Sequence, residues 1–286
     1  WFCLEILMMK KLIIAALALL LTSGAMAQER LVVAGGSLVE LLYALGAGDT
    51  LVGVDETTSY PPETKALPHI GYWKQLSAEG ILSLAPTTFI TWQDAEPKLV
   101  LNQLAQQKVK VLTLPRTPAT VERMYRNIHT LATSVNKTAQ GDELVASLQQ
   151  RLAAAAQKNQ QIAKPVRVMF LLSPGGGVPQ IAGTESVAGT ILSLAGGQNI
   201  ASHAEYKTYS GEAIIAANPD VIVVTTQSLA SADGKKQLGN VAGVTRTAAW
   251  KNQRIVEIDQ SLILGMGPRI VDAVEFLQQQ LYPNPA

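Results

Sequence analysis

Short apolar runs alternate with amphipathic stretches along the first part of the chain. The run RLVVAGG (30–36) predicts a buried strand that ends in glycines, and SLVELLYALGAG (37–48) predicts a helix with a serine cap and a glycine stop. TLVGVD (50–55) is typical of a strand, GILSLAPTTFITW (80–92) of a helix end followed by a strand, and KLVLNQLAQQKVKVLTLP (98–115) of a helix and a strand. This β-α-β-α order predicts α/β layers around largely parallel sheets.

A longer segment rich in alanine, glutamine, leucine and charge follows at 138–163. It predicts one helix of about 35–40 Å at about 1.5 Å per residue, ended by Pro165. The alternation of strands and helices restarts with RVMFLLSPGGG (167–177). We therefore expect an N-terminal α/β lobe at 28–137, the linking helix at 138–163 and a C-terminal α/β lobe at 164–286, with a ligand cleft between the lobes.

The second half of the chain repeats features of the first. SVAGTILSLAGG (186–197) matches the segment 37–48, and SGEAIIAANPDVIVV (210–224) matches SAEGILSLAPTTFIT (77–91). In the second pair a serine is expected to cap each helix, a glutamate to lie in its first turn and a proline to end it. The matched residues are Ser77, Glu79 and Pro86 in one half and Ser210, Glu212 and Pro219 in the other. The repeat predicts two pseudo-symmetric lobes.

The N-terminal segment has the pattern of a cleavable export signal. Two lysines precede the apolar run 12–21, and the small-residue site 25–27 follows. Residues 1–7 precede a plausible methionine start and are interpreted as upstream of the signal. The single cysteine, Cys3, lies there, so the mature chain from Gln28 is expected to have no disulfide and no thiolate site. A retained anchor helix is the alternative, although the run is short for a membrane span.

Composition narrows the classes of function. Hydrophobic residues make up 48% and charged residues 16% of the chain, which is typical of globular lobes with sizeable cores. The formal net charge of +1 provides no broad basic surface for nucleic acid. The three histidines lack zinc-site spacing, and the chain has no GxSxG, Walker or strand-linked GxGxxG motif. Nothing in these patterns indicates an enzyme, and an exported two-domain α/β enzyme is kept as an alternative.

Two aromatic residues stand out in HIGYWKQLSAEG (69–80), a predicted loop that leads into a helix. Only 5% of the chain is aromatic, yet Tyr72 and Trp73 are adjacent here. Taken from the residues alone, they either close the interface between the lobes or bind a ligand in the cleft.

The order of lobe, long helix and lobe, together with GYWKQLSAEGILSLAPT and GMGPRIVDA (265–273), resembles the periplasmic haem-binding proteins of ABC importers. These belong to the helical-backbone class of substrate-binding proteins, which also carries cobalamin and ferric siderophores. The resemblance covers about 28 to 283. It implies that Tyr72 is the axial ligand of ferric haem, as phenolate oxygen suits a hard ferric ion, and that Trp73 lies along the macrocycle.

The resemblance also implies cations for the haem propionates and contributions from the second lobe. Lys74, Arg116 and Lys207 are the candidate cations, because they fall near predicted loop ends. The segment 202–213 aligns with the Tyr72 loop, so three of its residues are expected at the cleft: His203, Tyr206 and Tyr209. Of these, His203 is a candidate second ligand of the haem iron. In some relatives the tyrosine pairs with an arginine of the second lobe, near the strand that follows Pro219. The corresponding region of this sequence has no arginine. Arg269, after Pro268, is a candidate for ligand binding or for a structural role.

The resemblance implies partners as well. In this class one glutamate on each lobe docks onto arginines of the two permease subunits, and the matching residues are Glu79 and Glu212. We therefore expect a periplasmic, non-enzymatic carrier that delivers haem to an inner-membrane ABC permease dimer and its ATPase, and that acts beside an outer-membrane haem receptor system. The alternatives within the class are cobalamin or a ferric siderophore, for which Tyr72 and Trp73 would be stacking walls. A structural or adhesive role is a further alternative.

Overall fold

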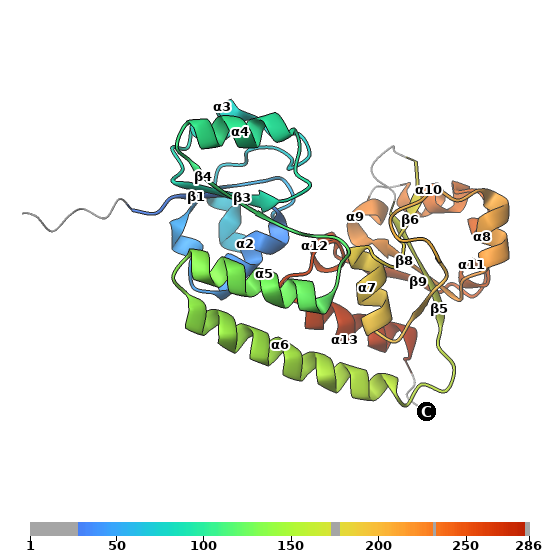
Figure 1. Cartoon of the computed structure of the whole chain (residues 1–286). Helices are drawn as coiled ribbons and strands as arrows, with labels where there is room; N and C mark the ends of the chain where they lie inside the picture. Colours follow the sequence, from blue (N-terminus) through green and yellow to red (C-terminus); the bar gives the residue numbers. More distant parts are fainter. Residues whose placement is uncertain (1–27, 173–177, 231–232, 284–286) are drawn as a thin grey trace, which may run out of the picture.

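The computed structural model describes residues 28–172, 178–230 and 233–283, and the expected export signal lies outside these residues. The chain forms two α/β lobes, each with its own sheet. In Figure 1 the first lobe is on the left and the second on the right. The predicted fold class is therefore confirmed, because each sheet is largely parallel and is accompanied by helices.

The sheet of the first lobe has four parallel strands in the order β2-β1-β3-β4. All residues of β1 and β3 are buried, as expected for central strands of a parallel sheet that is covered on both faces. The strands are β1 (Leu31–Ala34), β2 (Leu51–Val54), β3 (Thr88–Trp92) and β4 (Lys110–Leu114). The helical elements are α2 (Gly36–Ala44), η1 (Gly48–Thr50), η2 (Pro62–Ala66), α3 (Ala78–Leu82), α4 (Lys98–Gln106) and α5 (Val121–Ser134).

The sheet of the second lobe follows the order β6-β5-β8-β9, with β7 also paired to β5. Only the β5–β6 pair is antiparallel among its described pairings. The strands are β5 (Arg167–Leu172), β6 (Gln180–Ile181), β7 (Gln198–Asn199), β8 (Val221–Thr225) and β9 (Ile255–Ile258). The helices are α7 (Val187–Leu194), α8 (Gly211–Ala217), α9 (Thr226–Leu229), α10 (Gly234–Asn240), η3 (Val244–Arg246), α11 (Ala248–Lys251), α12 (Gln260–Ile263) and α13 (Ile270–Leu281).

The long helix α6 (Thr138–Asn159) connects the lobes along one side of the molecule (Figure 1). It packs on α5 of the first lobe and on α7 and α13 of the second. It ends four residues before the predicted end at 163. The chain leaves the helix through bonds from the amides of Gln161 and Ile162 to carbonyls three residues earlier, and Ile162 then packs beside Gly196 of the second lobe.

The predicted serine caps are confirmed for both helices of the repeated Ser-x-Glu pattern. Ser77 accepts a hydrogen bond from the Gly80 amide at the start of α3, and Ser210 accepts one from the Ala213 amide at the start of α8. Each cap satisfies an amide that has no partner within its helix.

The predicted cap of α2 is wrong, because Ser37 lies inside the helix. The helix begins one residue earlier, and the amide of Gly36 donates to Thr57 Oγ1 at 2.8 Å. The capping group thus comes from the loop after β2. The Thr57 hydroxyl in turn donates to the two oxygens of the Asp55 carboxylate at 2.8 and 3.0 Å. The preceding residue, Gly35, has a φ of +142°, and a Cβ there would lie 2.7 Å from Trp92 Nε1.

The apolar core continues from one lobe into the other. A single cluster of buried side chains contains Val32 and Phe89 of the first sheet, Leu148 of α6 and Phe170 of the second sheet. A smaller cluster lies on the other face of the second sheet and includes Met169 and Ile222. Because one core spans both lobes, moving them apart would expose apolar surface.

Candidate functional site

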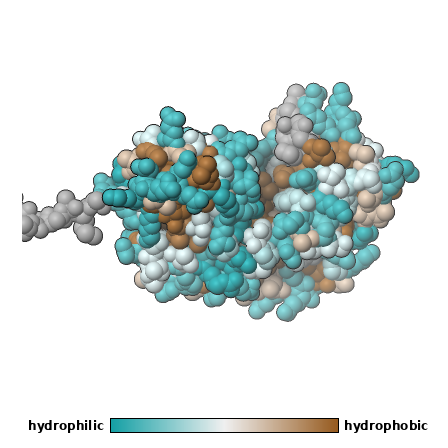
Figure 2. Space-filling view, turned by 45° about the horizontal axis from the view of Figure 1, so that its top comes forward, coloured by the Kyte–Doolittle hydropathy of each residue, from teal (hydrophilic) through white to brown (hydrophobic). Residues whose placement is uncertain are grey.

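A cavity of about 660 Å³ lies between the lobes and is lined by residues of both. The space-filling view shows the hollow between the two halves (Figure 2). In the first lobe the lining includes Thr57, Trp92 and Arg116, which lie at or after the carboxyl ends of β2, β3 and β4. Leu172 occupies the same position on β5 of the second lobe. The cavity therefore occupies the edge at which α/β sheets usually bind ligands.

The loop that carries Tyr72 is fixed by backbone bonds to the end of β2. The Ile70 amide donates to the Val54 carbonyl at 2.9 Å, and the Glu56 amide donates to the Gly71 carbonyl at 2.8 Å. Gly71 has a φ of +90°, a left-handed conformation that favours glycine. The Tyr72 side chain is 38% exposed and lines the cavity, so its phenol is accessible to a ligand.

Trp73 is buried beneath the Tyr72 loop and belongs to the cavity lining. Its ring meets the Tyr72 ring edge to face, with centroids 5.7 Å apart. Lys74 Nζ lies 4.6 Å from the centroid of the Trp73 ring, and Arg116 Cζ lies 5.0 Å from it. The indole ring therefore makes cation–π contacts with two cations at the cavity wall.

Asp94 holds both of these cations. Its carboxylate lies 2.9 Å from Arg116 Nη2 and 3.5 Å from Lys74 Nζ, which also donates to the Asp94 carbonyl at 2.8 Å. Partial burial acts to raise the pKa of Asp94, but the hydrogen bond and charge of Arg116 and the charge of Lys74 outweigh it and hold the pKa below its ordinary value. Asp94 is thus ionised at neutral pH and neutralises part of the charge of its partners.

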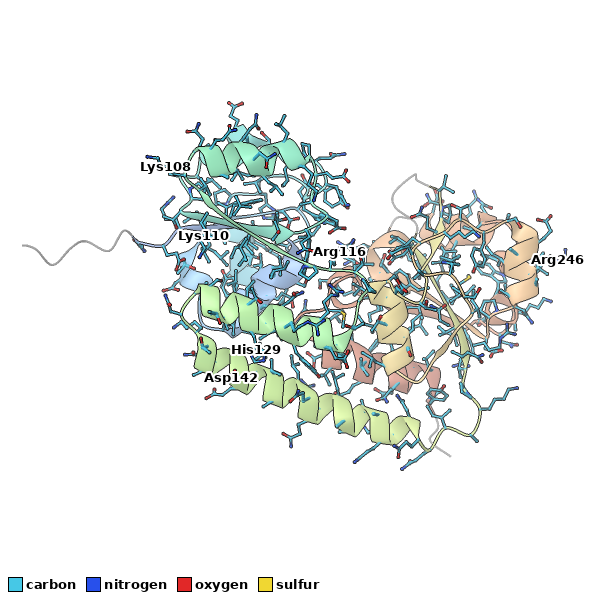
Figure 3. All side chains as sticks on the ribbon, viewed as in Figure 1. Lys108, Lys110, Arg116, His129, Asp142 and Arg246 are labelled. Carbon is cyan, nitrogen blue, oxygen red and sulfur yellow. The ribbon has the colours of Figure 1, made fainter. Side chains whose placement is uncertain are left out.

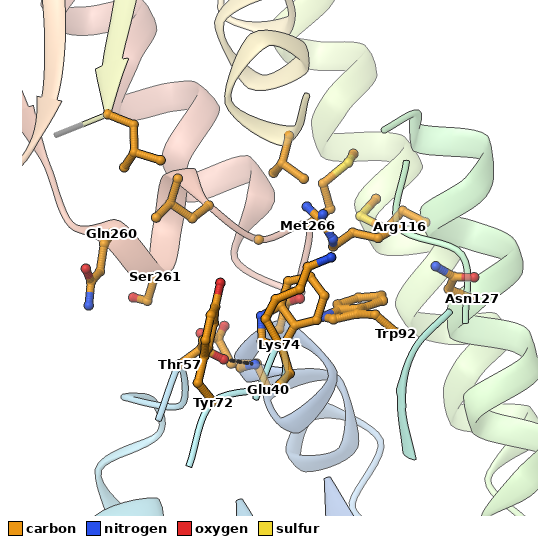
Figure 4. A pocket seen from close by; sticks show the side chains of 18 of the residues that line it. Glu40, Thr57, Tyr72, Lys74, Trp92, Arg116, Asn127, Gln260, Ser261 and Met266 are labelled. Atoms are coloured by element: carbon orange, nitrogen blue, oxygen red, sulfur yellow. Dashed lines mark hydrogen bonds between the residues drawn. The ribbon is translucent and has the colours of Figure 1, made fainter. Parts of the chain in front are cut away.

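The two phenols of the cavity come from opposite lobes. Burial raises the pKa of Tyr72, with Asp55 and Asp94 adding to this effect and Arg116 opposing it. Burial also raises the pKa of Tyr206 to about 12, and Arg116 again opposes the effect. Both phenols therefore carry their protons at neutral pH. Arg116 lies between the two halves of the molecule and beside Lys74 and Trp92 in the close view (Figures 3 and 4).

Arg269 lies outside the cavity lining and joins the lobes. Its guanidinium donates to the Glu40 carboxylate of α2 through Nε at 2.9 Å and Nη2 at 2.5 Å, and Nη2 also donates to Ser261 Oγ at 2.9 Å. The guanidinium stacks over the Tyr60 ring at 3.9 Å. Glu40 is 5% exposed, so a cation is needed beside it. Of the two roles expected for Arg269, the structure supports the structural one.

A second contact between the lobes lies in the loop between β4 and α5. The Ala119 amide donates to the Glu185 carbonyl at 2.8 Å, and the Ala119 carbonyl accepts from Thr190 Oγ1 at 2.6 Å. The same loop carries Arg116 and Thr120 into the cavity lining. The cavity is thus bordered by two fixed contacts between the lobes.

Tyr206 is the member of the second-lobe segment 202–213 that reaches the cavity lining. The Lys207 backbone pairs with Ile181, and neighbouring residues of an extended segment point to opposite sides. Lys207 and Tyr209 therefore lie away from the cavity, and Tyr209 packs on the smaller core cluster. The His203 ring packs edge-on against Tyr209, with centroids 5.4 Å apart, and its Nδ1 lies 2.6 Å from the Glu205 carbonyl.

The remaining lining includes residues that sequence reasoning missed. Arg123 and Asn127 lie one helical turn apart on α5, and both reach the cavity. The sequence does contain a pattern that predicts these two positions. Thr120, which caps the helix, precedes Arg123 by three residues and Asn127 by seven, and this spacing places all three on one side of a helix. Other cavity residues have no comparable signal: Glu56, Thr57, Trp92, Met124, Gln260, Ser261 and Met266.

Glu79 and Glu212 lie in the first turns of α3 and α8 and are both exposed. The structure thus presents one carboxylate on a short helix of each lobe. Within the described residues there is no group of three or more histidine, cysteine, aspartate or glutamate side chains placed to hold a metal ion. No helix among the same residues is long and apolar enough to cross a membrane.

Two lobes, a long connecting helix and a cavity between the lobes define a substrate-binding protein. The family model described as "Periplasmic binding protein" matches residues 31–262, and the chain belongs to this family. The family and its neighbours are substrate-binding transport proteins, which confirms the expectation that the chain is not an enzyme.

The solved structures and curated relatives that resemble the chain are themselves named for two kinds of ligand. The chain is 36% identical to the periplasmic heme-binding protein RhuT from Roseiflexus sp. RS-1, with a TM-score of 0.84, and the match covers 90% of this chain and 99% of that one. It is 33% identical to a periplasmic heme-binding protein from Pseudomonas aeruginosa, with a TM-score of 0.85 and coverage of 90% and 94%. It is also 26% identical to the vitamin B12-binding protein of Photorhabdus laumondii, over 87% of this chain and 86% of that protein.

Proposed function

We propose that the protein captures ferric haem in the cavity between its lobes and delivers it to an ABC permease in the inner membrane. The observation that carries this proposal is the accessible Tyr72 phenol, which a fixed loop holds in the cavity lining. A phenolate oxygen is a suitable axial ligand for ferric iron. The identity to heme-binding structures, which exceeds the identity to the vitamin B12-binding relative, supports the same ligand.

The cavity suits a flat macrocycle with a metal at its centre. Its volume of about 660 Å³ falls within the roughly 300–1,000 Å³ of typical small-molecule sites. Apolar side chains from both lobes, such as Trp92, Leu264 and Met266, provide surfaces for the ring. Iron binding requires the Tyr72 phenol to release its proton, which the charge of the ferric ion favours.

Delivery is assigned to Glu79 and Glu212. Each is exposed in the first turn of a short helix, one on each lobe. A carboxylate per lobe fits a partner made of two similar subunits, because each lobe then meets one subunit. Such exposed charges mainly orient the encounter. The expected export signal supports the periplasm as the location of this step.

Cobalamin is the second candidate ligand, because curated relatives are named vitamin B12-binding proteins. The two ligands are separated by titrating the purified mature protein with haemin and, in a parallel experiment, with cyanocobalamin while the absorption spectrum is recorded. Haem binding predicts a saturable change in the haemin spectrum with charge-transfer bands of a tyrosinate complex. Saturable binding of cyanocobalamin without any haemin complex would contradict the proposal.

A further inference from the structure

The charged residues of the cavity lining differ in whether an opposite charge of the protein lies beside them. Among the described residues, the cavity lining has five charged side chains: Glu40, Glu56, Lys74, Arg116 and Arg123. Glu40 is paired with Arg269, and both Lys74 and Arg116 are paired with Asp94. Lys74 also lies 3.8 Å from a Glu96 oxygen. The positive charge of Lys74 and Arg116 is therefore shared with carboxylates that the protein itself supplies.

Arg123 is different. No carboxylate among the described residues lies within ion-pair distance of Arg123, whereas Arg116 has Asp94. The Nε atoms of both arginines are buried without a hydrogen-bond partner in that part of the chain, so the missing counter-charge is what distinguishes Arg123. A partly buried guanidinium that lacks a counter-charge is unfavourable unless a ligand provides one. Its backbone is well fixed, because the Arg123 amide donates to Thr120 Oγ1 at 3.1 Å at the start of α5.

The unpaired charges of the lining are unevenly distributed, with a negative one at one side of the cavity and a positive one at the other, and this favours one orientation of an anionic ligand. Glu56 likewise has no ion-pair partner among the described residues. It lies on the Tyr72 side of the cavity, because its amide donates to the carbonyl of Gly71, the residue before Tyr72. Arg123 lies one turn from Asn127 on α5. In the close view Thr57 and Tyr72 are on one side, Asn127 on α5 is on the other, and Lys74, Trp92 and Arg116 lie between them (Figure 4). An anionic group is thus repelled from the Glu56 side and attracted to the α5 side.

We infer that Arg123 binds a carboxylate of the transported ligand and that this contact directs the anionic edge of the ligand toward α5. The inference rests on the proposed function, since haem has two propionate carboxylates on one edge. A guanidinium can bind a carboxylate through two parallel hydrogen bonds, which fixes orientation as well as adding affinity. In cobalamin the corresponding periphery carries neutral amides, so the contact also favours a dicarboxylate macrocycle.

The test compares haemin with haemin dimethyl ester, in which both carboxylates are esterified and the ferric porphyrin is retained. The Arg123→Met variant of the mature protein is expected to bind haemin about ten- to a hundredfold more weakly than the wild type, the usual range for a lost charged hydrogen bond. Its affinity for the ester should equal that of the wild type. Arg123→Lys, which keeps the charge but loses the two-pronged geometry, should bind haemin with intermediate affinity.

Arg126→Met is the matched control, because Arg126 is on the same helix, is exposed and does not line the cavity. It removes the same charge and should leave haemin affinity unchanged. Arg123→Gln replaces the methionine variant if circular dichroism shows that the latter is unfolded. Unchanged haemin affinity in the folded Arg123 variant, or equal losses for haemin and the ester, would overturn the inference while leaving haem binding intact. Failure of the wild type to bind haemin would instead overturn the proposed function and this inference with it.

Discussion

The Glu40 carboxylate on α2 and the Arg269 guanidinium before α13 form a two-bond ion pair that joins the lobes beside the cavity. The pair lies close to another tight contact between the lobes, since a Cβ on Gly265 would be 2.9 Å from Ser37 Cβ. Burial raises the pKa of Glu40, and the hydrogen bond and charge of Arg269 counteract that effect. The pair is therefore a structural feature of the boundary between the lobes.

Removing Arg269 alone should destabilise the protein strongly. Arg269→Met leaves Glu40, which is 5% exposed, without its partner, and we expect a loss of about 3–5 kcal/mol in the free energy of unfolding. The double variant Glu40→Gln/Arg269→Met should recover part of this loss, because no charge is left buried. Urea denaturation measures the effect, with the exposed Arg246→Met at the far end of the second lobe as a control (Figure 3). A loss for Arg269→Met no larger than that of the control would contradict this account.

The lobes should move little when ligand binds. They are connected by α6, by the Glu40–Arg269 pair, by the backbone bonds of Ala119 and by a shared core. Closure through a wide angle would bend the hydrogen-bond ladder of α6 or break these contacts. Small-angle scattering with and without haemin should give nearly the same radius of gyration. A contraction of several ångströms on binding would show that the connection acts as a hinge.

Haem binding through Tyr72 should strengthen as pH rises. The phenol is protonated in the free protein because burial raises its pKa, so forming the iron bond releases a proton and is favoured at higher pH until that pKa is reached. Arg116 opposes the rise, so Arg116→Met should raise the Tyr72 pKa further, weaken haemin binding at neutral pH and shift the pH profile upward. Haemin titrations across pH measure both effects. Identical pH profiles for the two proteins would exclude an influence of Arg116 on the phenol.

Glu79 and Glu212 should act in delivery and not in capture. The double variant Glu79→Lys/Glu212→Lys should bind haemin as the wild type does, because both residues are exposed and neither lines the cavity. It should fail to stimulate the ATPase of the permease in liposomes, since like charges would meet across the interface. The alternative is that each carboxylate only favours its helix dipole, by about 0.3–1 kcal/mol. Wild-type stimulation by the double variant would support that alternative.

Local patterns in the sequence predicted more of the fold than of the site. The caps at Ser77 and Ser210 were predictable because each involves residues three apart. The start of α2 was not, because its capping hydroxyl comes from Thr57 on a different loop. The strand order also depends on pairings between distant segments, which an alternation of apolar runs does not specify.

The same distinction applies to the cavity. Tyr72 was identified from the loop composition and the family resemblance, and it does reach the cavity lining. The alignment of segment 202–213 with the Tyr72 loop predicts His203, Tyr206 and Tyr209 at the cleft, but an extended backbone allows only alternate side chains to face one way, and Tyr206 is the one that lines the cavity. Arg123 was missed because its importance follows from the pairing of its neighbours: Asp94 occupies Lys74 and Arg116, and only the folded structure shows that.

The most direct test of the proposed function is the absorption spectrum of the Tyr72→Phe variant with haemin. This substitution removes the phenol oxygen and keeps the ring that packs against Trp73 at 5.7 Å, so the loop should stay folded. The charge-transfer bands of a tyrosinate complex should disappear, and haemin affinity should fall steeply. If the variant retains both the wild-type spectrum and the wild-type affinity, Tyr72 is not the iron ligand and the proposed mode of haem binding is wrong.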